Sequence, residues 1–151
     1  MFYIGGNDSM DTIAKLSRYG DRVGSSVRFI GVPKTIDNDL CLTDHTPGYG
    51  SAAKYIATIL KEVIRDSSVY DIRSVTVAEI MGRHAGWLAG AACLAGGDDS
   101  EGPDLILLPE VPFDQDKFLA KVDALQRVKP NVIIAASEGV KTADGTYLCD
   151  L

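Results

Sequence analysis

The sequence predicts an α/β fold built on parallel sheets. Short runs rich in β-branched and other apolar residues alternate with segments of helical periodicity, and the runs are apolar almost throughout. The glycines follow the ends of these runs, where turns belong. With 151 residues, of which 46% are hydrophobic and 24% charged, the chain is long enough to bury an apolar core and has the composition of a globular protein.

Five apolar runs are expected to form strands, because each is short and is flanked by turn-forming residues. They are residues 2–4, 27–32, 74–80, 104–108 and 131–136. Near its end the chain has the sequence Asp144-Gly145, which is typical of a turn, and we expect a new strand to follow it.

Helices are expected between most of these strands. Ser9 suits the N-cap of a helix over residues 10–19. Apolar residues recur with a period of 3.6 from Gly50 to Arg65, and again after Asp114, which suits an N-cap. Residues 84–95 are small and apolar enough to form a buried helix.

Charge and cysteine content exclude several classes of protein. The net charge is −6 and no cluster of Lys or Arg is present, which argues against a nucleic-acid binder. No apolar run approaches the roughly 20 residues that a membrane helix needs, and no charged and apolar leader precedes the first strand. The three cysteines are far apart and lack CxxC spacing, as expected for reduced thiols. We therefore expect a soluble, acidic, cytoplasmic protein.

Polar residues gather where the strands end, the usual place for ligands in open parallel sheets. After the first strand, Gly5-Gly6-Asn7-Asp8 can turn sharply and bring backbone N–H groups close to an anion. The pattern is neither a Walker A loop nor a dinucleotide fingerprint. A Gly-Gly pair also often does no more than close a loop between a strand and a helix.

The segment after the second strand, Lys34-Thr35-Ile36-Asp37-Asn38-Asp39, carries more chemistry. Its two carboxylates repel each other unless a cation or a substrate hydroxyl uses them. Asp37 can accept a hydroxyl proton, Thr35 can bond a phosphate or sugar oxygen, and Lys34 can neutralise a phosphoryl group. The alternative is a solvated surface turn. The Pro-Lys-Thr sequence at the strand end favours the functional interpretation.

Two further strand ends carry candidate ligands for a phosphorylated sugar. Met81-Gly82-Arg83 is expected to open a helix and to offer an arginine to phosphate oxygens. Glu138, between a serine and a glycine, is a candidate for binding sugar hydroxyls, and Glu110 is an exposed acid at another strand end. His45 and His84 are isolated from each other, so we interpret both as structural.

Taken together, these sequence segments at the strand ends resemble the phosphofructokinase family, and the resemblance extends over nearly the whole chain. The resemblance implies a partial fold of three-layer, parallel-sheet lobes of the phosphofructokinase type. Residues 1–48 would form the last part of the first, phosphoryl-donor lobe, and residues 49–151 most of the second, sugar-phosphate lobe. The family's glycine-rich phosphate loop and its C-terminal 6-phosphate ligands have no match here. We therefore expect a fragment that is inactive alone.

The resemblance also implies a reaction and roles for the candidate residues. The family transfers a phosphoryl group from ATP or pyrophosphate to the 1-hydroxyl of fructose 6-phosphate, with Mg²⁺. Asp37 corresponds to the base, while Thr35 and Asp39 hold the sugar and the magnesium-phosphate end. Further residues contact the substrate or stabilise charge on the moving phosphoryl group: Lys34, Met81, Gly82, Arg83 and Glu138. Shared sugar sites in the family imply a homo-oligomer, either a dimer or a tetramer.

The expected phosphoryl donor is pyrophosphate. Asp8 stands where ATP-using relatives carry a glycine, and its carboxylate would repel an α-phosphate. The donor site would comprise Gly6, Asn7, Asp8 and Lys34. Asn7 replaces the family's usual magnesium-ligating Asp, so Asn7 and Asp8 are the candidate metal ligands. An ATP-dependent enzyme and a non-catalytic module that binds sugar phosphates are the alternatives.

Overall fold

The computed structural model describes residues 1–151, which divide into two compact units. Unit 1 is Met1–Gly50 and unit 2 is Ser51–Leu151, and each is described by itself. The sequence placed a boundary between residues 48 and 49. The assignment of the two parts to a donor lobe and a sugar lobe stays a prediction. No helix combines the length and the apolar character needed to cross a bilayer.

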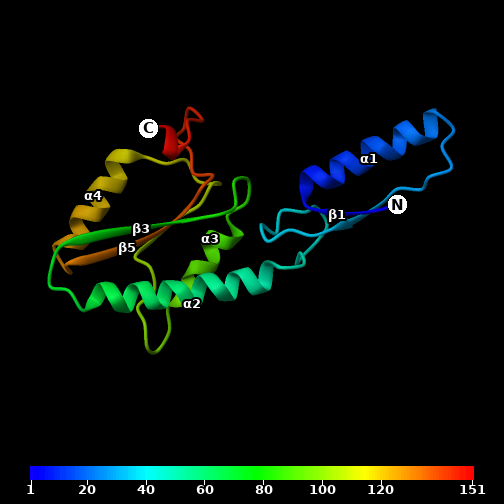
Figure 1. The fold of residues 1–151 in the computed structure, drawn as a ribbon. Coiled ribbons are helices and arrows are strands. Elements are labelled where there is room, and N and C mark those ends of the chain that lie inside the picture. The colour runs from blue at the N-terminus through cyan, green and yellow to red at the C-terminus, as the bar shows by residue number, and fades with distance from the viewer. The chain divides into compact units, whose positions relative to one another are not determined.

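Unit 1 is a parallel strand pair joined by one helix (Figure 1). Strands β1 (Phe2–Gly5) and β2 (Ile30–Pro33) pair in register from Phe2 and Ile30 onward, and α1 (Asn7–Arg22) connects them. A Cβ on Gly31 would lie 2.9 Å from the sulfur of Met10, so α1 packs tightly on this face of the sheet. The opposite face carries four exposed apolar side chains, Phe2, Ile4, Ile30 and Val32.

Two expected boundaries in unit 1 are wrong. Helix α1 begins at Asn7 with Gly6 as its N-cap, so Ser9 lies inside the helix rather than capping it. The Gly-Gly turn reverses the chain at once, and the helix starts without a polar cap. The second strand begins at Ile30 rather than at residue 27, because its only neighbour, β1, begins at Phe2 and pairs there with Ile30.

Unit 2 holds a three-stranded parallel sheet in the order β3-β5-β4. In Figure 1, α4 lies on one side of these strands, and α2 and α3 lie on the other, which gives three layers. The elements in chain order are α2 (Tyr49–Ser68), β3 (Ser74–Ile80), α3 (Trp87–Ala91), the 3₁₀ turn η1 (Ala92–Ala95), β4 (Leu105–Leu107), α4 (Gln115–Gln126), β5 (Asn131–Ser137) and the 3₁₀ turn η2 (Leu148–Asp150).

The core of unit 2 forms around its central strand. After its first residue, every residue of β5 is buried, with Val132 and Ile134 fully so. Leu88 of α3 and Val140, just beyond the strand, join them in the core. A strand buried on both faces needs apolar residues throughout, which explains its nearly unbroken apolar sequence.

The sequence predicted most of unit 2. The strand over residues 74–80 is confirmed as β3. Asp114 caps α4, its Oδ1 accepting a hydrogen bond from the Lys117 N–H at 3.0 Å. Two predictions are wrong. The helix expected over residues 84–95 begins at Trp87 and ends in a 3₁₀ turn. The strand expected after Gly145 is a single antiparallel bridge followed by η2.

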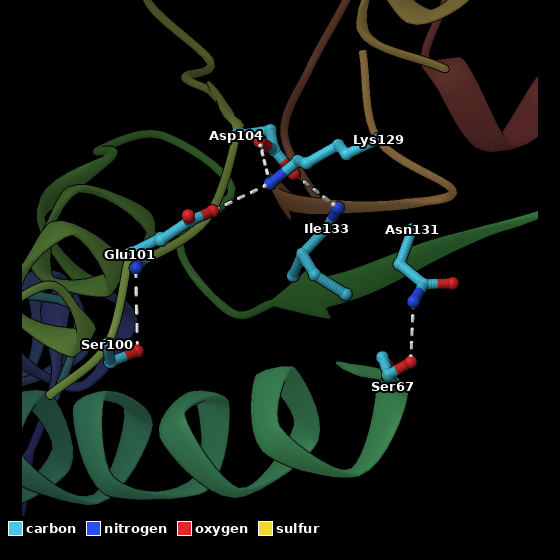
Figure 2. Close-up of polar contacts among 8 residues, drawn as sticks. Ser67, Ser100, Glu101, Asp104, Lys129, Asn131 and Ile133 are labelled. Carbon is cyan, nitrogen blue, oxygen red and sulfur yellow. Dashed lines mark hydrogen bonds and ion pairs between the residues drawn. The ribbon is translucent and has the colours of Figure 1, made fainter. Parts of the chain in front are cut away.

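Asp104 joins the amino ends of β4 and β5 (Figure 2). Its backbone N–H donates to the Ile133 carbonyl at 2.7 Å, and its Oδ2 accepts from the Ile133 N–H at 2.8 Å. Its Oδ1 lies 2.6 Å from Lys129 Nζ, which also reaches Glu101 at 3.2 Å. Burial opposes the charge on Lys129, but the two carboxylates outweigh it and raise the pKa of this lysine above 10.5.

A cavity of about 620 Å³ lies beside this cluster, at the amino edge of the sheet. Its lining includes Arg65, Asp99 and Asn131. Arg65 and Lys61 both pair with Asp99, and their charges lower the pKa of that carboxyl, with the Lys61 hydrogen bond the largest cause. Every strand of this sheet is parallel, so this edge is the opposite one from the carboxyl ends where ligands are expected.

Candidate active site

The first part of the candidate site lies where β1 and β2 end in unit 1. The turn at Gly5 and Gly6 leads directly into α1, whose first turn presents N–H groups without partners inside the helix. The Lys34 N–H donates to the Gly5 carbonyl at 2.8 Å and extends the strand pairing by one bond. A Cβ on Gly6 would lie 3.6 Å from both Lys34 O and Thr35 Cβ. The two predicted phosphate-binding segments are therefore in contact.

Thr35 is buried, and its hydroxyl organises the segment that follows. Its Oγ1 accepts a hydrogen bond from the Asp37 N–H at 3.1 Å, a turn in which a side chain replaces a backbone acceptor. The Thr35 hydroxyl proton is not used in this bond, so it remains a donor for a ligand oxygen. The structure thus gives Thr35 a second role, in shaping the backbone at Asp37.

A hydrogen bond joins the two halves of this region. Asn7 Nδ2 donates to Asp39 Oδ2 at 2.9 Å, linking the start of α1 to the end of the segment after β2. The other carboxylate oxygen, Asp39 Oδ1, is buried and has no hydrogen-bond partner. A buried carboxylate oxygen without a partner is costly, and a divalent cation or a ligand hydroxyl would satisfy it. The residues present therefore fit a hard cation.

Three members of the predicted donor site, Asn7, Asp8 and Lys34, are exposed. Asp8 stands in the first turn of α1, where an anion would approach the helix N-terminus. A carboxylate in that position competes with any additional phosphate. Lys34 directly follows β2.

The second part of the candidate site lies in unit 2, where β3 and β5 end. Residues 81–86 form a loop, so Met81-Gly82-Arg83 does not open a helix as predicted. Gly82 has φ +125°, a conformation that L side chains rarely adopt and that a helix does not contain. The Glu138 N–H donates to the Ile80 carbonyl at 2.9 Å, which brings the two strand ends together.

Glu138 and Ser137 hold this loop by its backbone. The Gly82 N–H donates to Glu138 Oε1 at 3.2 Å, and Ser137 Oγ donates to the Gly82 carbonyl at 2.7 Å. Glu138 Oε2 lies 4.0 Å from Arg83 Nη2, and the Arg83 side chain is 62% exposed. The structure thus brings the predicted residues Gly82, Arg83 and Glu138 together and leaves the guanidinium open to an anion.

Two further contacts that the sequence did not predict, made by Gly139 and Glu110, shape the same loop. Gly139 touches Arg83 so closely that a Cβ there would lie 2.0 Å from the Arg83 carbonyl oxygen. Glu110 Oε1 accepts a hydrogen bond from the Gly86 N–H at 2.7 Å, at the N-cap of α3. A glycine directly after a strand-end acid was the available signal for Gly139. Nothing in the sequence indicated that Glu110 would bond Gly86, which is 24 positions away.

The two histidines, His45 and His84, and the three cysteines are all exposed. No three His, Cys, Asp or Glu side chains gather in an arrangement that could hold a metal ion. The three cysteines are free. The predicted residues thus form one cluster in unit 1, around Asn7 and Asp39, and another in unit 2, around Gly82 and Glu138.

Comparisons with known proteins match the chain to one family. The family model described as Phosphofructokinase matches residues 1–151. A Xanthomonas campestris protein named pyrophosphate–fructose 6-phosphate 1-phosphotransferase is 49% identical over 150 residues, covering 98% of this chain and 36% of the relative. A Clostridium perfringens protein named ATP-dependent 6-phosphofructokinase 2 is 39% identical over 143 residues, covering 94% of this chain and 36% of that relative.

Among solved structures, the pyrophosphate-dependent phosphofructokinase from Nitrosospira multiformis has a TM-score of 0.84 and 46% identity. The match covers 96% of this chain and 37% of that one. The chain therefore spans little more than a third of the length of the proteins it matches.

Proposed function

Because this chain belongs to the phosphofructokinase family, we propose that the protein carrying it transfers a phosphoryl group from pyrophosphate to the 1-hydroxyl of fructose 6-phosphate. The products are fructose 1,6-bisphosphate, an intermediate of glycolysis, and inorganic phosphate. The observation that carries the proposal is the cluster at the ends of β1 and β2. There, Asn7 is bonded to Asp39, and the segment that contains Asp37 contacts the turn at Gly6.

In this proposal Asp37 is the general base. The sugar oxygen forms a bond to phosphorus as the bridging P–O bond of pyrophosphate breaks, and the hydroxyl proton passes to Asp37. Thr35 donates its free hydroxyl proton to a ligand oxygen. Lys34 places positive charge beside the moving phosphoryl group. Such catalysis depends on positioning and electrostatics, which suits a segment fixed by hydrogen bonds.

The unit 2 cluster would bind the sugar phosphate. Arg83 offers its exposed guanidinium to phosphate oxygens, and Met81 and Gly82 lie beside it on the same loop. Glu138 uses one oxygen for the Gly82 N–H. Its second oxygen is a candidate acceptor for a sugar hydroxyl.

Mg²⁺ fits the unit 1 cluster. Asp39 Oδ1, Asn7 Oδ1 and the Asp8 carboxylate would hold it, and Asp39 Oδ1 is the buried oxygen that has no hydrogen-bond partner. In proteins this ion is often bound through one or two carboxylates together with substrate phosphates. When bound, it would supply positive charge that offsets the charge of the phosphates.

We further propose that the whole protein is cytoplasmic and forms a homo-oligomer, a dimer or a tetramer. Three free, exposed cysteines suit a reducing compartment. The resemblance to a family with sugar sites shared between subunits supports the oligomer. Light scattering of the whole protein would measure its mass, and a monomeric mass would refute this part of the proposal.

A chimera tests the reaction. Residues 1–151 would replace the matched third of the Xanthomonas campestris relative, which supplies the remaining length. We expect turnover of fructose 6-phosphate with pyrophosphate and Mg²⁺, and none with ATP. Turnover with ATP but not with pyrophosphate would show that ATP is the phosphoryl donor. No turnover with either donor would refute the reaction and favour a binding module.

Asp8→Gly in the same chimera tests the choice of donor. Removing this carboxylate should allow ATP to be used, because it removes the charge that repels an α-phosphate. Asp11→Gly is the matched control, since it makes the same change one turn further along α1. If Asp8→Gly gains no ATP turnover, or if Asp11→Gly gains as much, Asp8 does not determine the donor.

A further inference from the structure

The loop that follows the predicted base closes on itself through two buried polar residues, Asn38 and Thr46. Asn38 is 7% exposed and Thr46 is 3% exposed. Asn38 Oδ1 accepts a hydrogen bond from the Thr46 N–H at 2.9 Å, and Asn38 Nδ2 donates to the Asp44 carbonyl at 3.1 Å. Asn38 thus uses both ends of its amide within the loop.

Thr46 ties the same loop to the end of β2. Its hydroxyl donates to the Thr35 carbonyl at 2.6 Å, and the same Oγ1 lies 3.2 Å from Asn38 Oδ1. One hydroxyl carries one proton, so the shorter contact, to Thr35, is the main bond. A parallel bridge between Thr35 and Gly48 closes the loop just beyond. The segment from Thr35 to Asn38 is therefore held at both ends.

The backbone at Asn38 needs this support. Asn38 has φ +57°, in the left-handed region, which costs free energy for a residue other than glycine although asparagine tolerates it best. Asn38 stands between Asp37 and Asp39, so the direction of its backbone sets where both neighbouring carboxylates leave the chain. Polar groups this deeply buried also make the loop rigid when they are fully bonded.

We propose that Asn38 and Thr46 are positioning residues for this reaction, because their hydrogen bonds fix the backbone that carries Asp37 and Asp39. The proposal rests on the proposed function for the role of Asp37. Neither residue needs to touch substrate. Displacing a catalytic group by about 1 Å can cost about 100-fold in rate, so the effect should appear in kcat.

Three substitutions separate positioning from folding. Thr46→Val keeps the shape and removes the hydroxyl, whereas Thr46→Ser keeps the hydroxyl and should restore function. Asn38→Gly keeps the left-handed backbone accessible and removes the side-chain bonds. Thr58→Val is the matched control, because the Thr58 hydroxyl also donates to a backbone carbonyl, at 2.9 Å, on α2.

The first measurement is amide hydrogen exchange in the 151-residue chain, which needs no activity. The Asp37 N–H, bonded to Thr35 Oγ1, should exchange faster in Thr46→Val and Asn38→Gly. Its exchange should be unchanged in Thr46→Ser and Thr58→Val. Unchanged exchange in Thr46→Val and Asn38→Gly would overturn the proposal.

The second measurement is kinetics in the chimera. Thr46→Val and Asn38→Gly should lower kcat about 100-fold while the KM for fructose 6-phosphate changes little, and Thr46→Ser should restore kcat. A defect in Thr46→Ser as large as in Thr46→Val, or kcat values unchanged in both loop variants, would overturn the proposal. If the unaltered chimera is inactive, the proposed function fails, and the exchange rates alone decide whether the two residues fix the backbone.

Discussion

Gly139→Ala should displace the loop at residues 81–86 without unfolding unit 2. The new Cβ would lie 2.0 Å from the Arg83 carbonyl oxygen, whereas ordinary van der Waals contact begins near 3.4 Å. Both atoms belong to or adjoin the main chain, so no flexible side chain can absorb the clash. The loop must therefore move by about 1.4 Å, which for a substrate-positioning segment corresponds to a loss of about 100-fold in kcat/KM.

The assay is turnover of fructose 6-phosphate by the chimera with and without the substitution. Gly90→Ala is the matched control: a Cβ at this position in α3 meets nothing within 4 Å. Fluorescence of the single tryptophan of the 151-residue chain, which lies in unit 2, measures unfolding when the same substitutions are made in that chain. If Gly139→Ala keeps kcat/KM within threefold of the unaltered chimera, the Gly139 contact does not set the position of the loop.

Two further predictions concern stability in unit 2. Asp104→Ala should lower the free energy of unfolding by about 2 kcal/mol, because it leaves the Ile133 N–H without its acceptor. Asp104→Asn keeps an acceptor for this N–H and should lower the free energy of unfolding by about 1 kcal/mol or less. Urea unfolding followed by tryptophan fluorescence checks this, and equal losses in the two variants would contradict it. The Lys117 ammonium, 2.7 Å from Asp114 Oδ2, is the largest cause that lowers the pKa of Asp114 below 3.8, and the Lys117 N–H that bonds Oδ1 is the next. The stabilisation from these two bonds is therefore present above that pH and is lost as the pH falls through the lowered pKa. A ¹³C titration in which Asp114 has its midpoint at or above 3.8 would contradict the second prediction.

The sequence was most informative where one physical requirement dominates. Strand β3 and the cap of α4 were predicted because a nearly continuous apolar run and an Asp before a periodic segment have few other interpretations. The candidate residues around Asp37 and Arg83 were found because paired carboxylates and a glycine-arginine turn at strand ends are chemically unusual. Their roles remain predictions.

Partners distant in the sequence explain what could not be predicted. Strand β2 begins at Ile30 because its partner β1 begins at Phe2, which pairs with Ile30. Residues 27–32 by themselves carry no information about where β1 begins. Residues 81–86 form a loop rather than a helix because Ser137 and Glu138 bind the backbone of Gly82. Thr46 gave no signal at all, since a single threonine after a histidine has no recognisable pattern.

The contacts that hold the loop at residues 81–86 are made almost wholly by its main chain. Its N–H, its carbonyl groups and a close glycine contact define its shape, while the side chains of Met81 and Arg83 are exposed. In the proposed function, the shape of the loop and its recognition of a ligand therefore depend on different atoms. Substitutions at these two positions would alter the charge and size of the group bound there without altering the scaffold. A laboratory-evolution library confined to Met81 and Arg83 would explore new substrates while sparing the fold.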